Sequence, residues 1–290
     1  VNGQGGTNEL TIDNSGDTSG GSGELSATMF KHDTMPGDIT HSGFDQLDVW
    51  LGSGDDQFFI GGTPDGSVTT VTTGDEITVD NRLNDIINIG GAAGFLQVDA
   101  GAGNDVIRVN YDRFGKQTYE NGTPAEVVLH GEDGSDLYEI GLAGTGSSLI
   151  RVTDNSTDGS PNRLKVYGTP EKDFFLFRPG VIAAIGLDEQ GNQTGDAERI
   201  NYDSTINDVA VYGGDEVDTF VLDDTNSPLT LYGEAGADIF QVGQIFAAPR
   251  HFADLLNTSD PTIDAVVFAK LVGLQAATLD SAGDQFRTTL

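Results

Sequence analysis

Residues 96–109 read LQVDAGAGNDVIRV, and this stretch predicts the local architecture of much of the chain. Leu96 and Val98 are two residues apart, and so are Ile107 and Val109. A spacing of two places side chains on the same face of a β-strand. The segment between the two apolar pairs contains two glycines, which are typical of a tight corner. The stretch therefore predicts a strand, a glycine corner and a second strand.

An aspartate stands two residues before the second apolar pair, and the same register recurs along the chain. Large apolar residues follow each such aspartate at the second and fourth positions. In every unit except that of Asp85, apolar residues also precede the aspartate by nine and seven positions. We call these residues the anchor aspartates: Asp56, Asp85, Asp105, Asp136, Asp173, Asp218 and Asp238.

The repetition favours stacked coils over separate hairpins, because each strand can then pair with its counterpart in the next unit. The separation of 20 residues from Asp85 to Asp105, and again from Asp218 to Asp238, is about the length of one coil of a repeat protein. Parallel strands joined by crossovers are almost always right-handed. We therefore predict an all-β fold, a right-handed parallel β-solenoid resembling a β-helix or β-roll, with irregular coil lengths.

The repeats extend over most of the chain and fade towards its end. We predict a β-solenoid over residues 1–246, and a similarity between residues 13–17 and 154–158 suggests two larger copies, 7–140 and 147–246. Residues 247–290 are expected to be irregular, either a cap or a connection to a further coil. Strand-like sequence at both ends also predicts continuation into a longer filament, by further chain or by end-to-end stacking.

Composition limits the classes of partner. The 290 residues include 40 Gly, no Cys, 14 basic and 46 acidic residues, giving a net charge of −32. Such a charge disfavours nucleic acid and anionic lipid and favours cations. No run reaches the roughly 18 apolar residues of a membrane span. We expect no nucleic-acid partner and no membrane span. Because the chain has no cysteine, we expect any cross-link that stabilises the fold to be a cation held by oxygen ligands.

Two motifs resemble a known class of repeat. Residues 51–60, LGSGDDQFFI, and 101–109, GAGNDVIRV, resemble the hemolysin-type (RTX) calcium-binding repeats. Residues 236–245, GADIFQVGQI, look like segments of very long, repeat-rich bacterial surface proteins. The resemblance implies a secreted, extracellular or cell-surface β-solenoid with calcium at its glycine-aspartate turns, acting in adhesion, a matrix or a surface layer. RTX rolls, however, have uninterrupted nonapeptides, whereas these turns lie 20 or more residues apart.

Calcium at the corners is also reasonable on chemical grounds. Ca²⁺ takes six to eight oxygen ligands, and a glycine corner can offer carbonyls beside its carboxylates. Anchor aspartates stacked at about 4.8 Å would repel by about 0.9 kcal/mol per pair in water, and binding a cation would relieve this. The alternative is an aspartate that caps its corner by accepting backbone N–H bonds. The predicted calcium ligands are Asp55, Asp56, Asp105, Glu132, Asp133, Asp136, Asp215, Glu216, Asp218, Glu234 and Asp238.

An enzymatic function is the alternative class. Parallel β-helices also include polysaccharide lyases and hydrolases that use paired carboxylates. Carboxylates are too abundant here to indicate a pair, the four histidines have no metal-ligand spacing, and His32–Asp33 is assigned to the solvated surface. We therefore predict a structural or adhesive protein rather than an enzyme. Its expected partners are neighbouring copies or repeats and, as the open alternative, a polysaccharide that it binds or cleaves.

Overall fold

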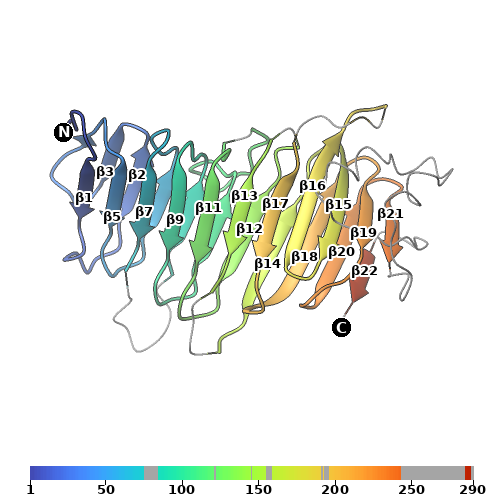
Figure 1. The fold of residues 1–290 in the computed structure, drawn as a ribbon. Helices are drawn as coiled ribbons and strands as arrows, with labels where there is room; N and C mark the ends of the chain where they lie inside the picture. Colours follow the sequence, from blue (N-terminus) through green and yellow to red (C-terminus); the bar gives the residue numbers. More distant parts are fainter. Residues whose placement is uncertain are drawn as a thin grey trace.

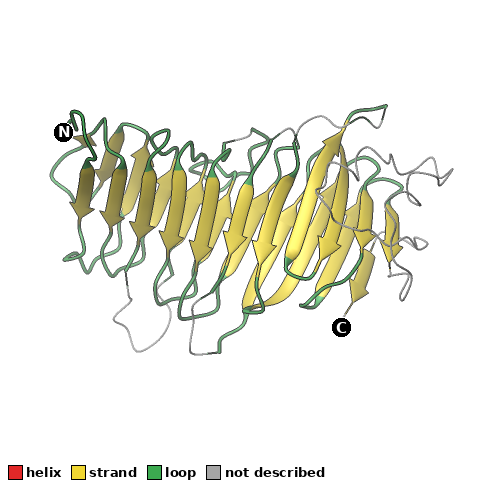
Figure 2. Ribbon diagram, in the orientation of Figure 1, coloured by secondary structure: helices red, strands yellow, loops and turns green. Residues whose placement is uncertain are grey.

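The computed structural model is all-β and describes residues 1–74, 84–120, 122–144, 146–154, 159–190, 192, 196–242 and 285–288 (Figures 1 and 2). These residues form strands, turns and loops, and no helix occurs among them. The strands make two sheets of eleven strands each. The two sheets run along the length of an elongated body, as Figure 2 shows.

The first sheet combines strands from almost the whole chain. Its strands lie in the order β1 (Glu9–Asp13), β5 (Gln46–Trp50), β7 (Val68–Thr72), β9 (Phe95–Asp99), β11 (Glu126–His130), β13 (Leu149–Val152), β17 (Glu198–Tyr202), β16 (Val181–Leu187), β15 (Lys172–Arg178), β19 (Thr219–Leu222) and β21 (Ile239–Val242).

The second sheet combines the intervening strands. Its order is β22 (Gln285–Thr288), β20 (Leu229–Glu234), β18 (Ile206–Gly214), β14 (Asn162–Tyr167), β12 (Leu137–Gly141), β10 (Val106–Val109), β8 (Ile86–Ile89), β6 (Gln57–Ile60), β2 (Ser22–Ser26), β3 (Met29–His32) and β4 (Ile39–Thr40).

Parallel pairing of equivalent strands is confirmed. Ile107 of β10 pairs with Ile87 of β8 on one side and with Tyr138 of β12 on the other. Leu96 of β9 pairs with Val127 of β11 in the same way. The two strands of residues 96–109 thus belong to different sheets, and the glycine corner carries the chain from one sheet to the other.

Antiparallel strands interrupt the parallel order at three places. β3 pairs antiparallel with both β2 and β4 at one end of the second sheet, and β22 pairs antiparallel with β20 at the other. In the first sheet, β16 lies antiparallel between β15 and β17. The strand-like character expected near both ends is therefore present, as β1 and β22, although β22 is not a parallel coil strand.

The core lies between the two sheets and is filled by the alternate residues that the register predicts. Leu96, Val98, Ile107 and Val109 are all buried. In the later units the stacked core side chains are aromatic: the ring centroid of Phe220 lies 5.0 Å from that of Phe175 and 4.8 Å from that of Phe240. Because each strand shares its neighbours' register, the inner side chains line up along each sheet and pack against those of the facing sheet in one continuous core.

The expected C-terminal segment, residues 247–290, lies outside the described residues apart from β22. Residues 155–158, on which part of the two-copy prediction depends, also lie outside them. The division into two copies and the handedness of the coils therefore stay predictions.

Candidate functional site

The first candidate site is a ladder of anchor aspartates where the strands of the second sheet begin. In each step the carboxylate Oδ1 of one anchor accepts the backbone N–H of the anchor before it. Asp56 N–H donates to Asp85 at 2.7 Å, Asp85 N–H to Asp105 at 2.8 Å, and Asp105 N–H to Asp136 at 2.8 Å. The anchors therefore hydrogen-bond successive units together at this edge: they accept backbone N–H groups, but from the preceding unit and not, as the alternative to calcium supposed, from their own corner.

The ladder continues through two asparagines that the sequence analysis missed. Asp136 N–H donates to Asn162 Oδ1 at 2.7 Å, and Asn162 N–H donates to Asn207 Oδ1 at 2.7 Å. Each asparagine has the anchor register, with apolar residues two and four positions later. A search that accepted Asn as well as Asp at the anchor position would have found both. We call these residues, with the anchor aspartates, the rungs of the ladder.

A second ladder lies at the opposite edge, where strands of the first sheet begin. Asp173 N–H donates to Asp218 Oδ1 at 2.8 Å, and Asp218 N–H donates to Asp238 Oδ1 at 2.9 Å. The sequence analysis placed all seven anchors in one register, but the structure divides them between two edges. The reason is that the strand before Asp173, β14, belongs to the second sheet and the strand after it, β15, belongs to the first.

Burial raises the pKa of several rung carboxylates. Removal from water raises the pKa of Asp85 to about 7, that of Asp173 to about 7 and that of Asp218 to about 8. Neighbouring carboxylates add to the shift, because Asp173 and Asp238 both raise the pKa of Asp218. The cause is general: a buried carboxylate loses hydration, and a like charge nearby disfavours ionisation.

The second carboxylate oxygen of several rungs is buried without a hydrogen-bond partner. This holds for Oδ2 of Asp56, Asp85, Asp218 and Asp238. In the second ladder this oxygen lies against the first glycine of its corner. A Cβ added at Gly213 would come within 2.3 Å of Asp218 Oδ2, and one at Gly233 within 2.1 Å of Asp238 Oδ2. The corner glycine is therefore required because the carboxylate occupies the space of a side chain.

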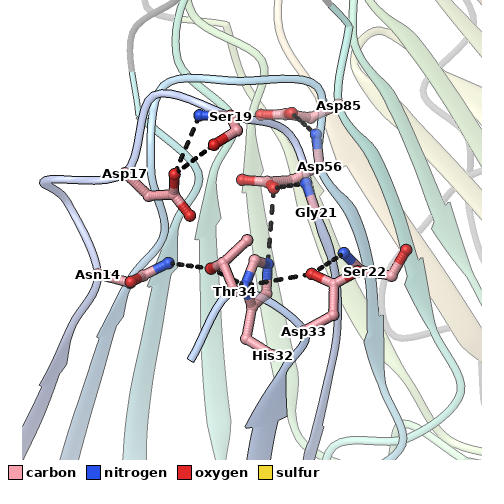
Figure 3. Close-up of polar contacts among 10 residues, drawn as sticks. All are labelled: Asn14, Asp17, Ser19, Gly21, Ser22, His32, Asp33, Thr34, Asp56 and Asp85. Carbon is pink, nitrogen blue, oxygen red and sulfur yellow. Dashed lines mark hydrogen bonds and ion pairs between the residues drawn. The ribbon is translucent and has the colours of Figure 1, made fainter. Parts of the chain in front are cut away.

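The first ladder begins at a histidine that the sequence analysis misassigned. His32 is buried rather than solvated, and its Nε2 lies 3.6 Å from Asp56 Oδ1, which also accepts the Gly21 N–H at 2.8 Å (Figure 3). Burial raises the pKa of Asp56 and His32 opposes this shift. The assignment was wrong because β3 folds back antiparallel on β2, which carries His32 inward, and Asp33 accepts the Ser22 N–H at 3.0 Å.

The predicted calcium ligands divide into inner and outer residues. Asp56, Asp105, Asp136, Asp218 and Asp238 are rungs whose Oδ1 atoms accept backbone N–H groups. The remaining ligands lie towards the solvent at the corners: Asp55, Glu132, Asp133, Asp215, Glu216 and Glu234.

Two outer acids from adjacent coils come together. Gly214 pairs with Glu234 across β18 and β20, and the charge of Asp215 adds to the effect of burial in raising the pKa of Glu234. Within the described part of the chain, no three acidic or histidine side chains converge as a metal site. The donor set of a cation at this corner would therefore include backbone carbonyls and water as well as carboxylates.

No protein-family model matches the sequence, and the comparisons with curated proteins and with solved structures return no match. Among the described residues, no helix is long and apolar enough to cross a membrane.

Proposed function

We propose that the chain is a right-handed β-solenoid that serves as an extracellular structural or adhesive element of a filament, matrix or surface layer. Two eleven-stranded, mostly parallel sheets that enclose a continuous core support a structural role. In the first sheet, β1 and β21 are the outermost described strands at opposite ends, and both pair in parallel with their single neighbours. A further parallel coil could extend the sheet beyond either strand.

The observation that carries the proposal is the pair of buried carboxylate ladders in a chain of net charge −32. Such a body is most stable where its carboxylates are neutralised, by protons on the rungs or by cations outside them. Extracellular proteins meet millimolar calcium, and extracellular modules bind calcium at about 10⁻⁴ to 10⁻³ M. We place calcium at the outer acids, with Asp215 and Glu234 as the best-supported pair.

The test is a thermal unfolding series at about pH 8, in millimolar calcium and in excess chelator at matched ionic strength. Calcium at ten to a hundred times Kd stabilises the folded state by roughly 1.4 to 2.7 kcal/mol per site, so the melting temperature should rise. The same comparison at about pH 5 should give a smaller rise, because protons then compete for the carboxylates. Asp215→Asn with Glu234→Gln should reduce the rise, whereas Asp112→Asn, in an outer loop, should not.

Equal melting temperatures in calcium and chelator at about pH 8 would eliminate calcium stabilisation. Sedimentation of the same samples addresses assembly: species larger than the monomer, with a coil added beyond β1 or β21, support the filament. A strictly monomeric protein at all concentrations would eliminate end-to-end assembly of this chain.

A further inference from the structure

A short loop between β10 and β11 holds an aromatic ring in solvent. Asp112 Oδ1 accepts the N–H groups of Phe114 at 2.8 Å and of Lys116 at 2.9 Å, and Asp112 N–H donates to the Lys116 carbonyl at 2.8 Å. Tyr111 and Gln117 form an antiparallel bridge at the base of the loop. These bonds fix the loop, yet the Phe114 side chain is 87% exposed.

The loop borders a pocket of about 380 Å³ on the outer face of the second sheet. This volume lies in the usual range for small-ligand sites, about 300–1,000 Å³. The pocket walls carry aromatic, amide and charged side chains, including Phe59, Phe114, Gln57, Asn88, Lys31 and Arg113. The guanidinium of Arg113 lies 5.5 Å from the centre of the Phe59 ring, a cation–π contact that helps to position it.

Two cations meet one carboxylate in this pocket. Glu24 Oε2 lies 2.6 Å from Arg113 Nη2 and 3.1 Å from Lys31 Nζ. The three groups leave one positive charge in excess, on a chain in which acidic residues outnumber basic ones by 46 to 14. Arg113 and Lys31 are 48% and 42% exposed, so both retain donors that face solvent.

We propose that this pocket binds an acidic saccharide, a uronic-acid unit of a polysaccharide. The sugar ring would stack on Phe114, its carboxylate would accept hydrogen bonds from Arg113 and Lys31, and its hydroxyls would pair with the amides and with Glu24. Arginine and carboxylate form a favourable charge-assisted pair. The inference deepens the adhesive part of the proposed function by naming the ligand class.

The other anionic ligands fit less well. An acidic peptide gains affinity by pairing with a free strand edge, but the pocket lies over β2, β6 and β8, each of which is already paired on both sides. A nucleic acid needs several phosphate contacts along its length, and the net charge of −32 opposes them. A short uronate presents its charge to the two cations alone.

The experiment is isothermal titration calorimetry with trigalacturonate, and with neutral galactotriose as the control ligand, both in chelator. Chelator removes calcium bridges between the sugar and the acidic corners, so that only the pocket is measured. We expect binding of the uronate, with no measurable binding of the neutral sugar. Arg113→Gln and Lys31→Gln should each weaken it about tenfold, the effect of one lost charge-assisted hydrogen bond, and Phe114→Ala should also weaken it.

Arg151→Gln is the matched control. Arg151 is 45% exposed and pairs with Glu126 on the first sheet, so its substitution changes the net charge equally without touching the pocket. Its uronate affinity should equal that of the unsubstituted protein. Absence of binding in chelator, equal binding of both sugars, or tighter binding of a single-stranded oligonucleotide would each overturn the proposal. Because calcium is absent, these outcomes are independent of the calcium-stabilisation test.

Discussion

The first ladder contains two kinds of rung that make the same hydrogen bond. Asp85 accepts the N–H of Asp56 at 2.7 Å, and Asn162 accepts the N–H of Asp136 at 2.7 Å. The two side chains are nearly identical in shape, but only the aspartate can carry a charge. The comparison teaches that the position requires an acceptor for a backbone N–H. The charge of an aspartate at this position is not required and destabilises the fold unless it is neutralised.

The largest expected effect comes from placing a charge in an amide rung. Asn162 is buried, and its Nδ2 donates to the carboxylate of Asp154. Asn162→Asp removes that donor and sets two carboxylates against each other, so we expect a loss of about 3–5 kcal/mol of unfolding free energy at about pH 8. Urea denaturation measures the loss.

The loss should shrink at about pH 5, where the new carboxyl can hold a proton and donate again. Asn201→Asp is the control, because Asn201 lies on the outer face of β17 beside Arg199 and its substitution adds the same charge. An Asn162→Asp protein as stable as the Asn201→Asp protein would show that both kinds of rung tolerate charge equally.

The reverse substitution should stabilise the protein. The pKa of Asp85 is about 7 in the folded chain, against about 4 in an unfolded one. The stability that its protonation contributes is therefore fully present below about pH 4 and is lost as pH rises through about 7. Asp85→Asn keeps the acceptor and cannot ionise, so it should add about 1–3 kcal/mol at about pH 8.5 and close to nothing at about pH 4.5.

Urea denaturation of both proteins across this pH range measures the difference. The unsubstituted protein should lose stability as pH rises, and Asp85→Asn should lose less. Asp85→Leu separates the hydrogen bond from the charge: by leaving the Asp56 N–H without its acceptor it should cost about 1–3 kcal/mol relative to Asp85→Asn. A pH-independent difference between Asp85→Asn and the unsubstituted protein would contradict the raised pKa.

A smaller effect is expected at the corner before a rung. Glu234 has a φ of 67°, a left-handed conformation that is costly for a residue with a Cβ. In chelator, Glu234→Gly should stabilise the protein by about 0.5–1 kcal/mol, whereas Ala235→Gly, at a neighbouring corner position, should not. In calcium, a ligand role of Glu234 would reduce or reverse the gain, so thermal unfolding in both conditions distinguishes backbone strain from cation binding.

The strand register was predictable from sequence because it depends on local spacing. The apolar pairs around Asp105 and Asp136 are buried as expected, and their strands pair in parallel. The division of the anchors between two edges was not predictable, because the corner before Asp136, GEDGSD, and the corner before Asp238, GEAGAD, have the same glycine and glutamate positions although they lie at opposite edges. Asn162 was not predicted because the anchor pattern was defined by a carboxylate. The burial of His32 was not predicted because it depends on the turn between β2 and β3, which is not part of the repeat.

The hydrogen bonds of each ladder all point the same way. In each bond described, the N–H of a rung is donated to the next rung of the same ladder, which lies on its C-terminal side. A chain that folds from its N-terminus therefore leaves the N–H of the last folded rung without its acceptor until the next rung of that ladder is in place. We expect folding from the N-terminus to be completed unit by unit, because each new unit supplies the acceptor that the unit before it lacks.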